Sequence, residues 1–164
     1  MKKNTLDKIY QGFMEDIYYY LLSLCKNKHI AEDVMQETFF RAYLYFEDCP
    51  YDRIKPWLFR VAHNAYIDFI RKNKKNHIKS NDFFNTIADY KTPEDKLLMK
   101  EQYQEIWNII ENMPEKQKQA ILLCDFNDLS YKEAAEIMDV SLSYMKVLLF
   151  RARQSIRNQV ERNE

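Results

Sequence analysis

Cations and aromatic rings alternate along residues 54–75, IKPWLFRVAHNAYIDFIRKNKK. This combination suits single-stranded nucleic acid, because rings stack on unpaired bases while cations neutralise phosphates. Asn64 lies between two predicted helical runs, where a short loop would present its amide to a base edge. The alternative is that the rings, above all Trp57 and Phe69, belong to a buried core. The candidate DNA ligands of this segment are Lys55, Arg60, Asn64, Arg71, Lys72, Lys74 and Lys75.

A second basic segment covers residues 140–160, which hold four cations and no acidic side chain. Two local signals surround its start. Ser130-Tyr131-Lys132-Glu133 is a capping box that would open a short helix, and residues 139–141 would form a turn in which Ser141 caps the next helix. A short helix, a three-residue turn and a longer basic helix are the parts of a helix-turn-helix. The alternative is a helical hairpin whose charges are only solvated, since Asp139 stands where many such turns have glycine.

The second helix of this motif would divide its side chains between a core and a DNA-facing side. Steps of three and four residues direct Leu142, Met145, Leu149 and Ala152 inward. Short side chains on the outer side suit base edges and thymine methyl groups, while arginines suit guanine or phosphate. The inward residues would pack against Ile121, Leu122, Ala134, Ala135 and Ile137. The candidate DNA ligands of the motif are Ser143, Tyr144, Lys146, Val147, Arg151 and Arg153.

Acidic side chains gather on one side of a third segment, residues 31–43, AEDVMQETFFRAY. Val34, Phe39 and Tyr43 form the apolar side of the predicted helix. Neighbouring carboxylates can do acid–base chemistry or bind a metal, but no histidine completes a Glu-x-x-His pair at helical spacing. We therefore expect no metal site, no cofactor and no catalytic residue. The polar side carries Glu32, Asp33, Gln36, Glu37 and Arg41.

The composition of the 164 residues favours helices to carry these segments, because it includes a single glycine, Gly12, and four prolines. A phosphate-binding P-loop needs at least two glycines and a dinucleotide-binding motif needs three, so both are excluded. Gly12 falls inside the first predicted helix, where we expect close helix packing. The three cysteines are far apart, which favours reduced, buried thiols over a redox role or a metal site.

The predicted helices fall into two groups, so the expected fold is all-α with two small helical domains. Residues 74–91 are polar and lack helical periodicity. We predict domains at 1–75 and 93–164, joined by a flexible linker at 76–92. In the first domain the predicted helices span 5–25, 30–47, 56–64 and 65–73, and in the second they begin at Thr92-Pro93, Pro114, Ser130 and Ser141.

The net charge of zero conceals opposite blocks along the chain. Residues 51–79 carry a net charge of +6, and residues 80–115 carry −5. Two basic segments separated by an acidic one suit two sites for a polyanion. The chain has neither a membrane-spanning apolar run nor the apolar run of a signal peptide, so we expect a cytoplasmic protein without membrane insertion.

Taken in order, AEDVMQETFFRAY, PWLFRVAHNAYIDFIRK and LSYKEAAEIMDVSLSYMKVLLFRARQSIR resemble a bacterial sigma factor of the extracytoplasmic-function (ECF) subfamily. The resemblance covers nearly the whole chain. It implies a sigma-2-like helical bundle at 1–75 and a sigma-4-like helix-turn-helix domain at 93–164. The second helix of the helix-turn-helix departs from the family pattern, because Val147, Leu148 and Leu149 follow Lys146 where more basic residues are usual.

The resemblance also implies roles for the three segments. Asp33, Gln36, Glu37 and Arg41 would dock on the β′ clamp helices of the RNA polymerase core, and the second domain on the β flap. Residues 56–73 would recognise and melt the promoter −10 element, with Asn64 in a loop that holds a flipped base. The helix-turn-helix would read the −35 element.

The expected activity is promoter-specific transcription initiation by recruitment, not enzyme catalysis. Family members are commonly held inactive by an anti-sigma factor, often membrane-anchored, which adds a partner to core polymerase and promoter DNA. Two alternatives stay open: a stand-alone helix-turn-helix regulator with a sensing or dimerisation module, and a structural helical interaction protein.

Overall fold

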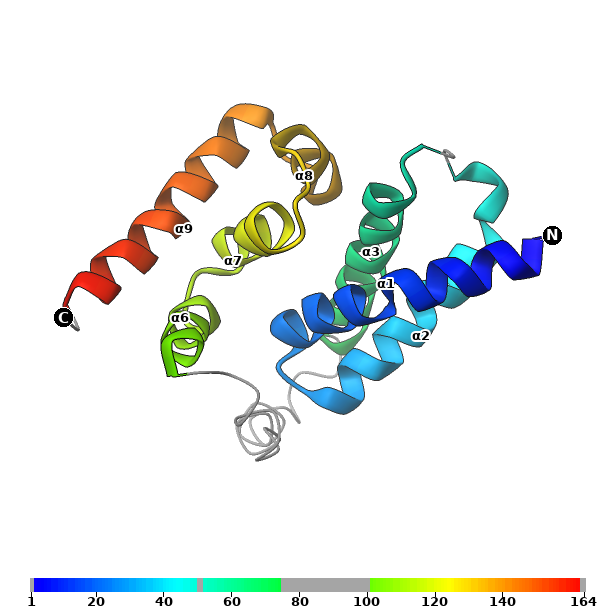
Figure 1. Ribbon diagram of the computed structural model, residues 1–164, viewed down its shortest axis with the longest axis horizontal. Coiled ribbons are helices and arrows are strands. Elements are labelled where there is room, and N and C mark those ends of the chain that lie inside the picture. Colours follow the sequence, from blue (N-terminus) through cyan, green and yellow to red (C-terminus); the bar gives the residue numbers. More distant parts are fainter. Residues whose placement is uncertain (1, 50–51, 75–100, 163–164) are drawn as a thin grey trace. The chain divides into compact units, whose positions relative to one another are not determined.

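The computed structural model describes residues 2–49, 52–74 and 101–162 (Figure 1). These residues form helices and short turns and contain no β-strand, so the predicted all-α fold is confirmed for them. The chain divides into two compact units, Met1–Asp89 and Tyr90–Glu164. The predicted linker at 76–92 and the predicted helix start at Thr92-Pro93 lie outside the described residues, so the domain boundaries stay a prediction.

The first unit is a bundle of three helices, each of which packs against the other two. They are α1 (Lys2–Cys25), α2 (Lys28–Leu44) and α3 (Ile54–Lys74), and a single 3-10 turn, η1 (Phe46–Asp48), follows α2. Asn27 caps α2, because its side-chain oxygen accepts hydrogen bonds from the backbone N–H groups of His29 and Ile30, at 2.9 and 3.2 Å. The core includes the fully buried Ile17, Leu21, Leu58 and Phe59.

The helix α3 is continuous, so the prediction of separate helices at 56–64 and 65–73 is wrong. Neither glycine nor proline interrupts residues 57–74, and Ala62, His63, Ala65 and Tyr66 are all buried across the predicted break. The His63 ring and the Tyr20 hydroxyl form a buried hydrogen bond of 3.1 Å between α3 and α1. Asn64 therefore lies on an exposed helical face and not in a loop.

The buried side of α2 also differs from the predicted apolar face. Val34 is buried, but Phe39 is only half-buried and Tyr43 is 55% exposed. Small residues face the bundle instead, which brings α2 close to its neighbours and leaves the large rings outside. The buried residues of α2 are Ala31, Val34, Thr38 and Ala42.

The second unit contains α6 (Glu101–Glu111), α7 (Glu115–Ile121), the π-helical turn η3 (Leu122–Phe126), α8 (Tyr131–Met138) and α9 (Leu142–Arg162). The long helix α9 packs against α6, α7 and α8 (Figure 1). The capping box is confirmed: Glu133 N–H donates to Ser130 Oγ at 3.0 Å, and Ser130 N–H donates to Glu133 Oε1 at 2.9 Å. Ser141 caps α9 by accepting from Tyr144 N–H at 3.1 Å.

The helix-turn-helix prediction is correct in its turn and in most of its core. Asp139 takes a left-handed backbone conformation with φ of 55°, which a short polar side chain tolerates in place of glycine. The prediction that Leu142 is buried is wrong, because this first residue of α9 is 44% exposed. The buried Leu148 extends the inner stripe instead. The predicted core residues that are buried are Ile121, Leu122, Ala134, Ala135, Ile137, Met145, Leu149 and Ala152.

Gly12 does not serve close packing, because a Cβ atom placed there would meet nothing within 4 Å. Glycine in the middle of a helix costs about 1 kcal/mol relative to alanine. We therefore expect Gly12→Ala to raise the free energy of unfolding of the first unit by about 1 kcal/mol, measured by urea denaturation followed by circular dichroism. Gln11→Ala, at the exposed neighbouring position, serves as the control with little change. Destabilisation by Gly12→Ala would contradict the open surroundings of residue 12.

Candidate nucleic-acid and polymerase interfaces

One exposed line of side chains runs along α3. Arg60, Asn64 and Arg71 are all exposed, and their spacing of four and seven residues puts them on one face of the helix; we call this set the α3 stripe. Trp57 borders the stripe, three residues before Arg60, and is half-buried. Of the other candidates in this segment, Lys72 and Lys74 are exposed, Lys55 is half-buried on the opposite face, and Lys75 lies outside the described residues.

Few of the rings in α3 can stack on bases. Phe59 is fully buried with its ring 5.4 Å from that of Tyr20, and Tyr66 is buried as well. Phe69 is half-buried on the side of the helix away from the α3 stripe. Trp57 is thus the ring of α3 that borders the α3 stripe. The alternative that the rings form core therefore holds for Phe59 and Tyr66, whereas Trp57 and Phe69, for which it was chiefly stated, are only half-buried.

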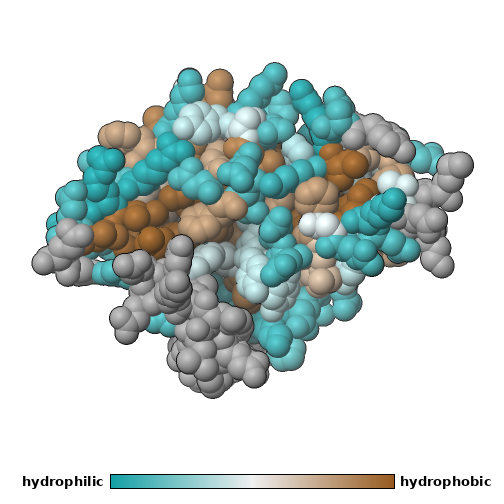
Figure 2. All heavy atoms as spheres, in the orientation of Figure 1, coloured by the Kyte–Doolittle hydropathy of each residue, from teal (hydrophilic) through white to brown (hydrophobic). Residues whose placement is uncertain are grey.

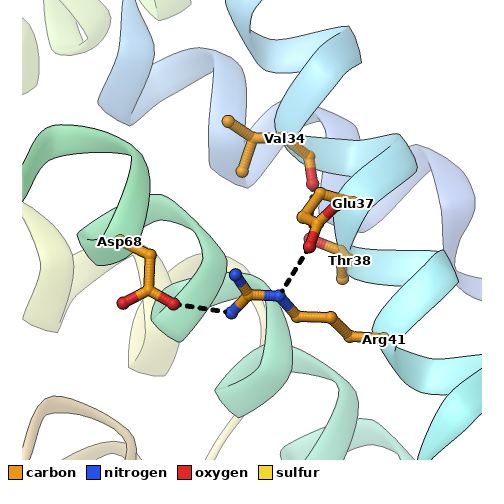
Figure 3. Close-up of polar contacts among 5 residues, drawn as sticks. All are labelled: Val34, Glu37, Thr38, Arg41 and Asp68. Atoms are coloured by element: carbon orange, nitrogen blue, oxygen red, sulfur yellow. Dashed lines mark hydrogen bonds and ion pairs between the residues drawn. The ribbon is translucent and has the colours of Figure 1, made fainter. Parts of the chain in front are cut away.

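Arg41 links α2 to α3 (Figure 3). Its Nε donates to Glu37 Oε1 at 2.9 Å, and its Nη1 donates to Asp68 Oδ2 at 2.8 Å. Burial disfavours the charged guanidinium, but the hydrogen bonds and the charges of both carboxylates outweigh that effect and raise the pKa of Arg41. Of the four predicted polymerase contacts, Asp33, Gln36 and Glu37 are exposed. Arg41 is engaged within the bundle, and Glu37 is one of its two partners.

A groove between α1 and α2 adjoins the polar side of α2. It shares Gln36 with the predicted polymerase contacts and adds the exposed apolar side chains Met14 and Tyr19 from α1. Neither residue is among the sequence-predicted contacts. Met14 lies four residues after Tyr10 and three before Ile17, as on a buried helix face, and Tyr19 carries no comparable signal. The lining of the groove consists of Met14, Glu15, Tyr18, Tyr19, Glu32, Met35 and Gln36.

The outer side of α9 carries a second exposed line. Ser143, Val147 and Phe150 follow one another at steps of four and three residues and are all exposed; we call this set the α9 stripe. Phe150 is 66% exposed and is not among the sequence-predicted DNA ligands. The available signal was its position outside the inward stripe of Met145, Leu149 and Ala152. The flanking candidates Tyr144, Lys146 and Arg151 are exposed too. Hydrophobic side chains reach the surface between hydrophilic ones (Figure 2).

Two cations of the second unit have aromatic or acidic partners. The Lys116 ammonium lies 5.6 Å from the ring centroid of Tyr144, which adds a cation beside the α9 stripe. Arg153 donates to both oxygens of Asp125, at 2.7 and 3.0 Å, and to the Tyr131 hydroxyl at 3.1 Å. These hydrogen bonds raise the pKa of Arg153. The predicted DNA ligand Arg153 is therefore already engaged within the protein.

The cysteines are not arranged for chemistry together. Cys124 is buried, and burial raises its pKa to about 11, so its thiol stays protonated near neutral pH. Cys25 and Cys49 are half-buried and are not joined in a disulfide. In the described part of the chain, no group of three His, Cys, Asp or Glu side chains lies together as a metal-binding site would require, and no helix there is long and apolar enough to cross a membrane.

Comparisons with known proteins match both units. The family model for Sigma-70 region 2 matches residues 9–76, and that for Sigma-70, region 4 matches residues 103–156. The ECF RNA polymerase sigma factor SigM of Bacillus subtilis is 40% identical, and the match covers 93% of each chain. The ECF RNA polymerase sigma-E factor of Haemophilus influenzae is 31% identical, with 86% of this chain and 80% of the relative covered.

Solved structures share the fold. CnrH, in a complex with the cytosolic domain of CnrY, has a TM-score of 0.70 at 17% identity over 99% of this chain and 91% of its own. The sigma factor RpoE of Bartonella quintana, in a complex with the anti-sigma factor NepR, has a TM-score of 0.68 at 18% identity, covering 94% and 97%. The ordered motifs, the matches to regions 2 and 4 and the identity to SigM together establish that the chain belongs to the ECF family of RNA polymerase sigma factors.

Proposed function

We propose that this sigma factor directs core RNA polymerase to promoters by using three separate surfaces. The polar side of α2, with the adjoining groove, would bind the β′ clamp helices. The α3 stripe would contact the −10 element, and the α9 stripe would read the −35 element. The observation that carries the proposal is that each of the three motif segments keeps an exposed face outside the core of its unit.

The chemistry of each surface suits its proposed target. Arg60 and Arg71 offer charge to phosphates, while Asn64 between them offers donor and acceptor groups to a base edge. On α9, Val147 and Phe150 offer apolar contacts to thymine methyl groups, and Lys146 and Arg151 flank them with positive charge. Opening DNA costs a few kcal/mol of unstacking per base step, and contacts to the separated strand would offset that cost.

The wider assignments are part of the same proposal. Residues 1–75 act as the sigma-2-like domain, 76–92 as the linker and 93–164 as the sigma-4-like domain, with the β flap as its polymerase contact. The protein works in the cytoplasm by recruitment and catalyses no reaction itself. An anti-sigma factor regulates it, as the complexes of the two solved relatives suggest. A stand-alone regulator is disfavoured, because the match to region 2 occupies the part of the chain that a sensing module would need.

Transcription in vitro with purified core polymerase tests the recruitment proposal. Adding the chain should stimulate specific initiation at a subset of a promoter library. The paired variant Gln36→Ala with Glu37→Ala should require about tenfold more protein for half-maximal stimulation, because one interface residue pair contributes about 1–3 kcal/mol to binding. Asp7→Asn removes an exposed acid elsewhere on α1 and should behave like the parent. Repression, or stimulation insensitive to the α2 variant, would count against the proposal.

Asn64→Ala should impair promoter opening more than duplex binding, because its amide would act only on separated bases. Permanganate reactivity of −10 thymines in the holoenzyme–promoter complex should fall about tenfold, a loss of about 1.4 kcal/mol. Asn73→Ala is a matched control, since Asn73 is an exposed amide on the opposite face of α3. An equal loss of duplex binding and opening would contradict a base contact at Asn64.

Arg151→Ala should cost about 1–3 kcal/mol on a duplex that carries the −35 element of a stimulated promoter. Fluorescence anisotropy at fixed salt, with a scrambled duplex in parallel, separates base reading from phosphate binding. Arg162→Ala removes an exposed arginine from the end of α9 and should affect the two duplexes equally. If Arg151→Ala weakens binding to both duplexes by the same factor, Arg151 contacts phosphate only.

A further inference from the structure

Arg153 connects three elements of the second unit. It projects from α9, its guanidinium binds both carboxylate oxygens of Asp125 in η3, and it donates to the hydroxyl of Tyr131, the first residue of α8. The guanidinium carbon also lies 5.6 Å from the Tyr131 ring centroid. A planar guanidinium bound through two parallel N–H groups fixes direction as well as distance.

The backbone on both sides of Asp125, whose carboxylate accepts from Arg153, is fixed by burial and by hydrogen bonds. Leu122, Leu123 and Cys124 of η3 are buried immediately before Asp125. The Asn127 side chain donates to the Leu122 carbonyl at 2.7 Å, and Leu129 N–H donates to the Leu123 carbonyl at 3.1 Å. These contacts fix the turn after Asp125, so the pair ties α9 to a defined point of the core.

The pair is too exposed to serve mainly as a source of stability. The side chains of Arg153 and Asp125 are 44% and 34% exposed, and ion pairs in such positions contribute little to the free energy of unfolding. The bonds to Asp125 and Tyr131 occupy a donor on each of the three guanidinium nitrogens. By contrast, no ion pair joins Lys146 or Arg151 to another residue in the described part of the chain.

We propose that Arg153 is a positioning residue for −35 recognition and not a DNA ligand: its link to Asp125 and Tyr131 fixes the tilt and rotation of α9, and thereby aims the α9 stripe at the base edges. The proposal rests on the proposed function of α9. Arg153 lies ten residues after Ser143, about 15 Å along the helix, so a small tilt at Arg153 would displace the reading end.

The deciding experiment measures the affinity of the full chain for the −35 duplex and for a scrambled duplex, over a range of salt concentrations. The variants are Asp125→Asn, Arg153→Lys and Arg153→Ala, with Asp128→Asn as a control that removes a neighbouring exposed acid. Asp125→Asn keeps the shape of the side chain, and Arg153→Lys keeps the charge while losing the two-pronged geometry. Circular dichroism at the assay temperature checks that each variant is folded.

The positioning role predicts that Asp125→Asn and Arg153→Lys each lower the ratio of specific to scrambled affinity about tenfold, as Arg153→Ala does, with unchanged salt dependence. A phosphate-binding role predicts the opposite pattern. Asp125→Asn would then free the arginine and strengthen binding to both duplexes, Arg153→Lys would retain binding, and Arg153→Ala would reduce the salt slope by about 0.9. That pattern, or an unchanged ratio in Asp125→Asn and Arg153→Lys, would overturn the proposal.

Arg151→Ala, measured in the same assay, separates this inference from the function on which it rests. If Arg151→Ala lowers the ratio while Asp125→Asn and Arg153→Lys do not, the positioning role alone is wrong. If none of these variants lowers the ratio, both the reading of the −35 element by α9 and the positioning role fail.

Discussion

Burial of one side of α2, α3 and α9 is the constraint on which the proposed binding surfaces depend. A small helical unit can exclude water from only one side of most of its helices, and their other sides stay exposed. The helix α7 differs, because four successive residues, 118–121, are buried. Alanine occupies many of the inner positions, including Ala31 and Ala42 of α2, Ala62 of α3 and Ala152 of α9. Small inner residues bring the helix axes close together and move large rings such as Phe40 and Phe150 to the surface. The surfaces proposed to bind polymerase and DNA are the sides of the helices that this packing leaves exposed to solvent.

Two ion pairs connect helices that carry proposed binding surfaces to their neighbours. Arg41 joins α2 to Asp68 of α3, and Arg153 joins α9 to Asp125 of η3. In both pairs a cation that looks available in the sequence is held by a carboxylate 27 or 28 residues away. Arg60 and Arg151, which form no ion pair with another residue of the described part of the chain, differ from these two in their surroundings and not in their residue type.

Local signals predicted the helix-turn-helix well. The capping box at Ser130, the cap at Ser141 and the turn at Asp139 depend on hydrogen bonds between residues three positions apart or on single backbone conformations. Such features are readable because both partners lie in one short window of sequence. The same windows could not distinguish one helix from two around Asn64. The helix is continuous there because His63 and Tyr66 are buried against α1. His63 forms a hydrogen bond with the Tyr20 hydroxyl, and the Tyr66 hydroxyl donates to the Leu24 carbonyl.

Helical composition, periodicity and caps predicted an all-α chain with two helical groups, because these are local properties of the sequence. The family was indicated separately, by the resemblance of the ordered motifs to ECF sigma factors. Only the tertiary structure shows which side of each helix is exposed. Phe59 is buried, whereas Tyr43 and Phe150 are exposed. Arg41 and Arg153 form ion pairs with Asp68 and Asp125. The physical reason is that exposure and pairing depend on partners from distant elements. The type of a residue determines which groups it can bind. Whether those groups are exposed and unpaired depends on the residues that pack around it in the folded chain.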